Sequence, residues 1–408
     1  MADMPPRTPP IPLEEAQARL LALAAPLSSE HVDVEGAVGR YLAEPLQARR
    51  TQPAADLSAM DGYAVMAETL DGPWEVVGES AAGHPFAGTV TPGQAVRVST
   101  GALLPAGAEM VILQEDLARD GNRIVLTGEA PSPVDKHIRR CGMDFAHGGD
   151  ILPAGAHIGP AQAALAISAG YKYLPVCRMP RVAVIDSGDE LASDPEACPM
   201  HQIPASNGAM LTAMARALPV EARRIGPVAD TMDGLIAAFD EADGSDVIIT
   251  SGGASVGDHD LVRPALERWG AAIDFWRVAI KPGKPILVAT RERSTRPGQG
   301  PQILLGLPGN PVSSFVTAFH FMMPLLRTLL GSRTPLPMTV PTRLGAPMRA
   351  NGARREFVRG WWNGESAVPL ALQDSGALSS LAASNVLIDR PAFAAEAGTG
   401  EEVKVFLL

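Results

Sequence analysis

The sequence has few cysteines and none of the patterns in which cysteine carries chemistry. Among its 408 residues, Cys141, Cys177 and Cys198 stand far apart and form no CxxC pair. This spacing excludes a zinc–thiolate or dithiol redox motif and favours idle thiols in a reducing compartment. The first twelve residues, MADMPPRTPPIP, lack the apolar core and cleavage site of a secretory signal. We therefore expect a cytoplasmic protein.

Positive charge and long apolar runs are also scarce. The chain has 34 Lys and Arg against 45 Asp and Glu, which gives a net charge of −11 and a pI of about 5.3. A protein that neutralises nucleic-acid phosphates needs a cationic face, so a simple nucleic-acid binder is excluded. Residues 151–171 and 302–326 contain no Asp, Glu, Lys or Arg, but prolines and glycines interrupt both. Neither predicts a membrane span.

Aromatic residues make up only 5% of the chain, whereas glycine (40) and proline (37) are abundant. The hydrophobic fraction of 46% is sufficient for ordinary packed cores. At roughly 100–200 residues per domain, the length predicts about two to four domains. We expect a turn-rich, multi-domain protein.

The first half of the chain combines a short helical region with an all-β module. The Leu/Ala spacing of residues 12–25 predicts a helix after a disordered, proline-rich tail. Short β-rich runs separated by turns then occur at 74–77, 95–99, 110–114 and 123–126, with a turn at 120–122. An alanine-rich helix over 159–170 and a linker over 175–180 are expected next.

From Arg181 onward, strand and helix signals alternate. We expect strands at 181–186, 220–225, 246–250, 273–279, 286–289 and 303–305, and helices at 207–218 (capped by Ser206), 231–242, 260–269 and 312–330. This alternation predicts βαβ units and a parallel sheet covered by helices on both faces. After the linker 334–341, short strands predict a small β-barrel.

These signals divide the chain into four parts. The predicted domains are an N-terminal helical/linker domain (1–50 plus 151–180), an inserted all-β module (51–150), an α/β domain (181–332) and a C-terminal β-barrel (333–408).

The segment DVIITSGGASVGDHD, residues 246–260, is the most informative for function. An apolar strand opens into a Ser/Gly-rich loop and then a helix, and such loops at strand ends bind anions through backbone N–H groups. The candidate ligands are Ser251, Gly252, Gly253, Ser255 and Gly257. A tight turn is the other interpretation, and no Walker motif GxxxxGK[ST] occurs.

Two more loops follow predicted strands of the same sheet: Ser187 to Glu190, and Gly306 to Pro311. In a parallel sheet all three would meet at one edge, although Pro-Gly-Asn-Pro taken alone favours a rigid turn. Cations gather at Arg277 and in the segment from Lys281 to Lys284, which suits an anionic ligand or a solvated turn equally.

Seven segments together resemble the MoeA family of molybdopterin molybdenumtransferases, the bacterial counterpart of the gephyrin E domain. They are SAMDGYAV (58–65), STGALLPAGAEMVILQE (99–115), SGDEL (187–191), SNGAML (206–211), TSGGASVGDHD (250–260), AIKPGKP (279–285) and GLPGNPVSSF (306–315). The resemblance runs in family order along nearly the whole chain, and it implies that residues 181–332 form a MogA/MoaB-like parallel-sheet domain.

The resemblance implies an activity as well as a fold. Family members insert molybdate, a substrate, into adenylylated molybdopterin and release AMP, with Mg²⁺ present. They are homodimers whose active site lies between the α/β domain of one subunit and the β module of the other. Further partners implied are a MogA-like adenylyltransferase and molybdoenzyme maturation factors, with no nucleic acid and no membrane.

Residue matching implies the site. The implied catalytic residues are Asp61, Thr100, Glu190, Asp230, Asp260 and Lys281, of which Glu190, Asp230 and Asp260 would also hold the metal. Matching also implies the substrate-binding residues Asp144, Pro308, Pro311, Arg359 and Ser375. The loop and charge arguments above add the substrate-binding candidates Ser251, Gly252, Gly253, Ser255, Gly257, Arg277 and Lys284. From the residues alone, Asp61 is a turn residue. Arg277 stands where the family commonly has a lysine, so a planar fork replaces a point charge.

Two other functions are kept as alternatives. A MogA/MoaB-type adenylyltransferase has a similar α/β domain but lacks the flanking β parts. A non-catalytic, gephyrin-like scaffold would bind without turnover and leave the clustered acids idle.

Overall fold

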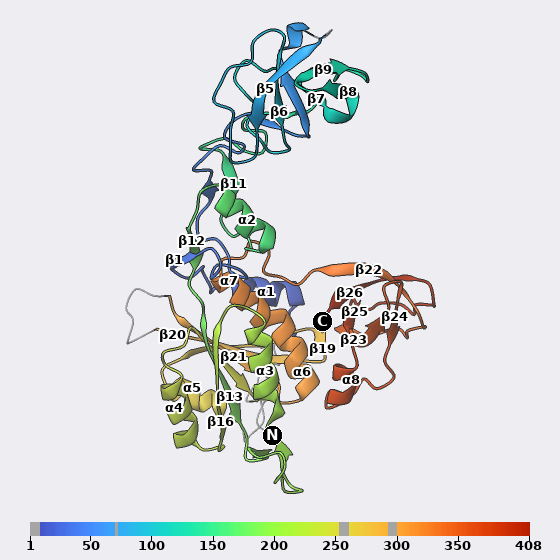
Figure 1. Ribbon diagram of the computed structural model, residues 1–408. Helices are drawn as coiled ribbons and strands as arrows, with labels where there is room; N and C mark the ends of the chain where they lie inside the picture. Colours follow the sequence, from blue (N-terminus) through green and yellow to red (C-terminus); the bar gives the residue numbers. More distant parts are fainter. Residues whose placement is uncertain (1–8, 70–71, 253–260, 293–299) are drawn as a thin grey trace, which may run out of the picture.

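The computed structural model describes residues 9–69, 72–252, 261–292 and 300–408 of an elongated molecule (Figure 1). The β module lies at one end, and a narrow segment with α2 (Pro160–Ser168) joins it to a body that contains the α/β domain and the barrel. Within these ranges, no helix is both long enough and apolar enough to cross a membrane. Residues 1–8 of the predicted disordered tail lie outside the described residues. The prediction of disorder is wrong at Ile11, which forms a parallel bridge with Val278.

The β module is built on one mixed sheet of order β7-β4-β6-β5-β9-β8. Its strands are β4 (Gly62–Val65), β5 (Trp74–Ser80), β6 (Gln94–Val98), β7 (Met110–Leu113), β8 (Leu117–Asp120) and β9 (Arg123–Leu126). Trp74 and Ile112 are fully buried in its core. The four predicted β-rich runs are confirmed, and the predicted turn at Gly121 connects β8 to β9.

Two short antiparallel pairs form the narrow segment. β2 (Leu46–Gln47) pairs with β11 (Asp150–Leu152), and β1 (Ser29–Asp33) pairs with β12 (Tyr173–Cys177). The predicted linker at 175–180 is therefore wrong at its start, since pairing with β1 makes this part of it a strand. The predicted helices near each end of this region are confirmed as α1 (Leu13–Leu21) and α2.

The α/β domain contains a six-stranded sheet of order β16-β13-β17-β21-β20-β18. Its strands are β13 (Arg181–Ser187), β16 (Glu221–Val228), β17 (Val247–Ser251), β18 (Ala272–Arg277), β20 (Pro285–Arg291) and β21 (Gln302–Leu307). The first four in this order are parallel, as predicted. β20 is antiparallel to both of its neighbours, β21 and β18. The connection 278–284 is too short for the crossover that a parallel pair needs.

Helices cover both faces of this sheet, as expected. α1, α3 (Ser206–Arg216), α6 (Pro311–Thr317) and α7 (Met323–Leu329) pack on one face, and α4 (Met232–Glu241) and α5 (Val262–Arg268) pack on the other. The predicted cap Ser206 is instead the first residue of α3, and Ala205 precedes it without a capping side chain. The predicted single helix over 312–330 is interrupted by a π-helical segment, η3 (Ala318–Met322).

The predicted C-terminal β-barrel is confirmed. Its strands are β22 (Thr339–Leu344), β23 (Arg355–Trp362), β24 (Ser366–Pro369), β25 (Val386–Arg390) and β26 (Glu402–Leu407), and a β23–β25 pairing closes the ring. A strand from the α/β domain, β19 (Ile280–Lys281), adds to β23 in parallel. The helix α8 (Leu378–Ala382) lies beside the barrel near α6 (Figure 1).

An aromatic cluster joins the barrel to the α/β domain. His320 of η3 is fully buried, with its ring 4.1 Å from that of Phe357 and 5.0 Å from that of Phe406. Neither ring nitrogen has a hydrogen-bond partner, while Gln17 donates to the His320 carbonyl oxygen at 2.9 Å. Burial, with a further contribution from the Arg355 charge, lowers the pKa of His320 to about 3.

Changing His320 to Leu should reduce the acid sensitivity of the fold. Folding lowers the pKa of His320 from its ordinary value of 6.5 to about 3. Above about pH 6.5 the ring is neutral in both states. As the pH falls toward 3, the unfolded chain takes up a proton that the folded protein does not, and the free energy of unfolding decreases. The contribution to the free energy of unfolding falls by up to about 1.4 kcal/mol per pH unit in that window. The free energy of unfolding of the variant, measured with urea at several pH values, should decrease less steeply with falling pH than that of the wild type. His84→Leu, an exposed change, is the control, and an equal effect there would contradict this assignment.

Backbone conformation at the end of β17 requires glycine. Gly252 follows β17 with φ +110°, and its N–H donates to the Leu307 oxygen of the neighbouring strand at 3.0 Å. Residues with a Cβ atom rarely adopt such a φ value.

Gly252→Ala should therefore destabilise the domain by about 1–3 kcal/mol. Gly244, exposed at the other end of the same strand with no atom within 4 Å of an added Cβ, provides the control substitution Gly244→Ala. Thermal or urea unfolding of both variants measures the difference, and equal stability would show that the position tolerates a Cβ.

Candidate functional site

The carboxyl ends of the parallel strands bring three of the predicted loops to one edge of the sheet. Asp186 is in register with Ser251, and Ser251 with Leu307, so the loops after β13, β17 and β21 start side by side. The Gly252–Leu307 hydrogen bond fixes two of them together. Ser251 is buried at this edge. The predicted residues Gly253, Ser255, Gly257 and Asp260 lie outside the described part of the chain.

Acidic residues line one side of this edge. The Asp189 carboxylate accepts from the Asp230 N–H at 3.1 Å, and Glu190 is close enough to influence Asp230 electrostatically. Burial raises the pKa of Asp230 above its ordinary value, and the charges of Asp189 and Glu190 raise it further. The structure therefore brings Glu190 and Asp230 together in a region of mutual repulsion that a cation would relieve.

The donor set at this position fits a hard cation. Its members are carboxylates, and Mg²⁺ prefers oxygen ligands, commonly one or two carboxylates plus substrate phosphates. Among the residues that the structure describes, no three acidic, His or Cys side chains form a ready metal cluster. Glu190 and Asp230 are oxygen donors of the type that Mg²⁺ accepts, but within the described residues they do not form a complete metal site.

Cations approach the same edge from the antiparallel strands. Arg277 ends β18, and the segment from Lys281 to Lys284 connects β19 to β20. A Cβ added at Gly283 would lie 2.4 Å from the Thr317 hydroxyl oxygen, so this segment packs directly against α6. Lys281 is half exposed, and its ammonium donates to Glu356 of the barrel at 3.0 Å.

The Pro308–Pro311 loop connects this edge to the barrel. Pro311 is the first residue of α6, and Pro308 is buried directly after β21. The Val312 N–H donates to the Ser375 carbonyl oxygen at 3.0 Å, which brings Ser375 to the site through its backbone. The Pro308–Pro311 loop, Lys281 and Ser375 thus all lie where the α/β domain meets the barrel.

Arg359 is buried in the barrel, where it binds backbone carbonyl oxygens. It is 1% exposed, and its guanidinium donates to the carbonyl oxygens of Leu372 at 3.1 Å and Asp374 at 3.0 Å. Burial lowers the pKa of Arg359. The side chain holds the segment before Ser375 in place, and its role in substrate binding stays a prediction.

The remaining predicted residues lie in the β module, at the other end of the molecule (Figure 1). The Asp61 carboxylate accepts from the Thr100 N–H at 2.6 Å and from its hydroxyl at 3.0 Å. These two bonds, the backbone one first, lower the pKa of Asp61. Asp144 is exposed near the base of the module, where its N–H donates to the Gln52 oxygen. The structure pairs Asp61 with Thr100 but does not bring them to Glu190 of the same chain.

Sequence reasoning missed three residues at the strand edge. Asn207 donates to the Gly309 oxygen at 2.6 Å, Glu356 binds Lys281, and Arg224 pairs with Asp186. Asn207 stands in the segment SNGAML, next to the expected helix start, so its position was a usable signal. The Lys281–Glu356 and Arg224–Asp186 ion pairs gave no signal in the sequence, because the partners of each pair are far apart along the chain.

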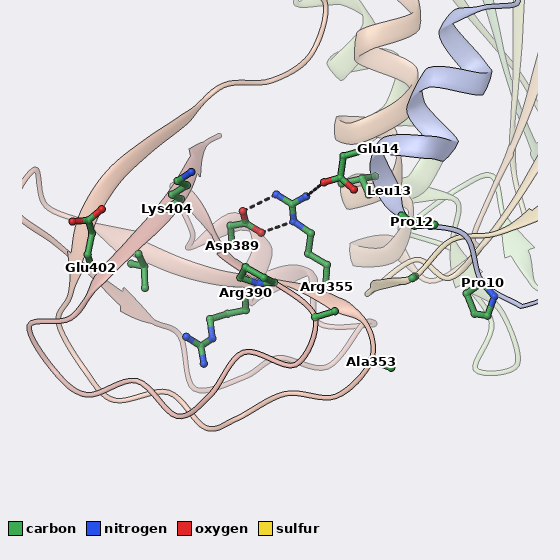
Figure 2. Close-up of a pocket in the computed structure, with 14 residues that line it drawn as sticks. Pro10, Pro12, Leu13, Glu14, Ala353, Arg355, Asp389, Arg390, Glu402 and Lys404 are labelled. Carbon is green, nitrogen blue, oxygen red and sulfur yellow. Dashed lines mark hydrogen bonds and ion pairs between the residues drawn. The ribbon is translucent and has the colours of Figure 1, made fainter.

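A cavity of about 770 Å³ lies elsewhere, between the N-terminal segment and the barrel (Figure 2). Arg355 at its wall is occupied, since its guanidinium binds Asp389 through two nitrogens and Glu14 through the third. The other charged lining residues are Arg390, Glu402 and Lys404. Acids and cations balance, so this cavity offers an anion no excess of positive charge.

Comparison with known proteins agrees with this geometry. Three family models match in chain order: "MoeA N-terminal region (domain I and II)" over residues 11–170, "Probable molybdopterin binding domain" over 183–328, and "MoeA C-terminal region (domain IV)" over 341–408.

Individual relatives cover most of the chain. A molybdopterin molybdenumtransferase of Nostoc is 35% identical over 81% of this chain and 77% of its own, and one of Bacillus subtilis is 30% identical over 98% and 94%. The crystal structure of a molybdopterin biosynthesis moeA protein from Pyrococcus horikoshii matches with a TM-score of 0.83 at 28% identity, covering 98% of this chain and 100% of that one. With its three regions matched in order along the chain, this protein belongs to the MoeA family of molybdopterin molybdenumtransferases.

Proposed function

We propose that this protein inserts molybdate into adenylylated molybdopterin and releases AMP, a late step in molybdenum cofactor biosynthesis. One observation carries the proposal: the Ser251–Gly252 loop, the cationic Lys281 segment and the acids Glu190 and Asp230 all belong to loops at the carboxyl-end side of one sheet. Both substrates are anions, and the cations and backbone N–H groups there are suited to bind them.

Each part of the edge has a task in this reaction. Ser251 and Gly252 begin the loop that holds the pterin phosphate or diphosphate, while Arg277, Lys281 and Lys284 attract and orient molybdate and phosphate oxygens. Arg359 acts indirectly, by holding the segment that carries Ser375. Pro308 and Pro311 restrict the loop that faces these groups, because proline fixes φ.

The acids act on the phosphoanhydride. Glu190 and Asp230 would hold Mg²⁺ and orient a water molecule toward the bond between the pterin phosphate and AMP. Addition of the water oxygen to phosphorus and departure of the other phosphate release AMP. When bound, Mg²⁺ would neutralise phosphate oxygens and lower the repulsion between substrate and carboxylates.

The two alternatives are less well supported. The matched MoeA regions on both sides of the α/β domain favour neither a MogA/MoaB-type adenylyltransferase nor a scaffold without turnover. AMP release from adenylylated molybdopterin, followed by chromatography with and without molybdate and Mg²⁺, tests the proposal. Release only when both ions are present supports it. Adenylylation of molybdopterin from ATP would identify the first alternative, and binding without AMP release the second.

Glu190→Gln should lower the rate of AMP release by about 100-fold or more, since a carboxylate that orients water contributes on that scale. Substrate binding, measured by calorimetry, should change little because the anion-binding loops are intact. Glu196→Gln changes an exposed acid six residues further along the chain; it is the control and should retain the rate. Normal turnover by the Glu190 variant would remove this residue from the mechanism.

We also propose a homodimer in which Asp61 and Thr100 serve the partner's site, since the β module holds them at a distance from Glu190 of their own chain (Figure 1). The compartment is the cytoplasm, and the proposed partners are a MogA-like adenylyltransferase that supplies the adenylylated substrate and maturation factors that receive the product.

Mixed dimers test this arrangement. Co-expressed Asp61→Asn and Glu190→Gln chains should regain about a quarter of wild-type activity, because half of randomly paired dimers contain one intact composite site out of two. Each variant alone should stay inactive. No recovery in a mixture shown to contain heterodimers would mean that Asp61 does not act across subunits.

A further inference from the structure

An ion pair between a buried carboxylate and a partly exposed arginine lies directly behind the substrate edge and takes no part in the chemistry proposed above. Asp186, near the end of β13, is 0% exposed, and Arg224 of β16 donates through Nε to its Oδ2 at 2.7 Å. The other carboxylate oxygen, Oδ1, is buried and has no hydrogen-bond partner within the part of the chain that the structure describes. Burial is the main influence on this carboxyl and raises its pKa.

Stability alone is a weak reason for such a pair. Transfer of the Asp186 carboxylate out of water is expensive, and solvent screens its attraction to an Arg224 side chain that is 33% exposed. The unpartnered Oδ1 adds to the unfavourable side. A role in fixing geometry accounts for the pair better than a gain in folding free energy.

The second contact of Arg224 shows what the pair holds. Its Nη2 donates to the carbonyl oxygen of Ala205 at 2.6 Å, one residue before α3. In the first turn of α3, a Cβ added at Gly208 would lie 2.0 Å from Asp186 Oδ2, so the helix backbone rests on the carboxylate. The guanidinium and carboxylate together fix the start of α3 relative to β13.

The start of α3 in turn fixes a loop of the site. Asn207, the second residue of the helix, donates through Nδ2 to the Gly309 carbonyl oxygen at 2.6 Å. Gly309 lies between Pro308 and Pro311, next to the strand that binds Gly252. The contacts therefore run without interruption from Asp186 through Arg224 and Asn207 to this loop.

We propose that Asp186, Arg224 and Asn207 are positioning residues that set the Pro308–Pro311 loop against the Ser251–Gly252 loop for binding of adenylylated molybdopterin. This inference rests on the proposed function for its substrate. The fork of Arg224 is essential to it, because one guanidinium must reach both Asp186 and Ala205, which a lysine ammonium does less well.

The opposite edge of the same sheet supplies a matched control. There Arg178 binds Asp246, which is 1% exposed and precedes β17, through two hydrogen bonds of 2.7 and 2.8 Å. Arg178→Lys and Arg224→Lys both keep the charge and both disturb a forked pair in one sheet. Only the second pair is connected to the Gly309 loop.

Arg224→Lys should raise KM for adenylylated molybdopterin by about tenfold or more, with a smaller effect on kcat, since small misplacements of binding groups have effects of this size. Arg178→Lys should leave KM within about twofold at a similar loss of unfolding free energy. Asn207→Ala should reproduce the KM effect, and the Arg224/Asn207 double variant should be no worse than the more affected single variant. Equal KM values in the Arg224 and Arg178 variants, or fully additive effects, would overturn the proposal.

Hydrogen exchange gives a readout without substrate. Amides in residues 306–314 should exchange faster in Arg224→Lys and Asn207→Ala than in wild type or Arg178→Lys. Unchanged exchange there would refute the positioning role even if the proposed reaction is found. Faster exchange in a protein that releases no AMP would instead support positioning and refute the assigned reaction.

Discussion

The parallel register of four strands is the constraint on which this molecule depends. Because β16, β13, β17 and β21 run in one direction, their carboxyl ends open on one edge, and the loops that follow them become neighbours despite their separation in sequence. Open parallel sheets bind ligands at this position for that reason. Acids enter from the loops after β13 and β16, and glycine-lined backbone follows β17, so charge of both signs and polar backbone share one region.

The antiparallel part of the sheet and the barrel complete the edge from the other side. β19 continues from the sheet into the barrel, where Lys281 is paired with Glu356 in the strand register as well as by its side chain. Behind this connection, the His320 ring packs with Phe357 and Phe406, and its two nitrogens have no hydrogen-bond partner among the described residues. The π-helical segment places this ring at the interface, and π-bulges are frequent where function constrains a helix. The barrel is thereby fixed against the α/β domain, and the Ser375 carbonyl oxygen accepts from the Val312 N–H at the start of α6.

Much of the architecture could be predicted from local patterns. Strand and helix alternation identified the α/β domain, turn residues such as Gly121 separated strands of the β module, and the Ser/Gly-rich loop after β17 directed attention to the carboxyl-end edge of the sheet. Long-range pairing carried the information that local patterns lacked. The strand at Pro175 depends on pairing with β1, and the antiparallel pairing of β18 with β20 depends on the short connection between them. The burial of Arg359 depends on a segment thirteen or more residues away, whose carbonyl oxygens it binds. Periodicity gave no sign of the π-helical interruption near His320, and ion pairs such as Asp186–Arg224 leave no mark in either partner's neighbourhood.

The narrow segment beneath the β module has a consequence for how the molecule can vary. The chain leaves the body through β2 and returns through β11, and these two strands are hydrogen bonded to each other. Because exit and return are adjacent, the intervening residues, 48–149, form a detachable unit in the topological sense. Its length and orientation can drift among relatives, or a short turn can replace it, while the sheet, its helices and the barrel keep every contact that they make among themselves.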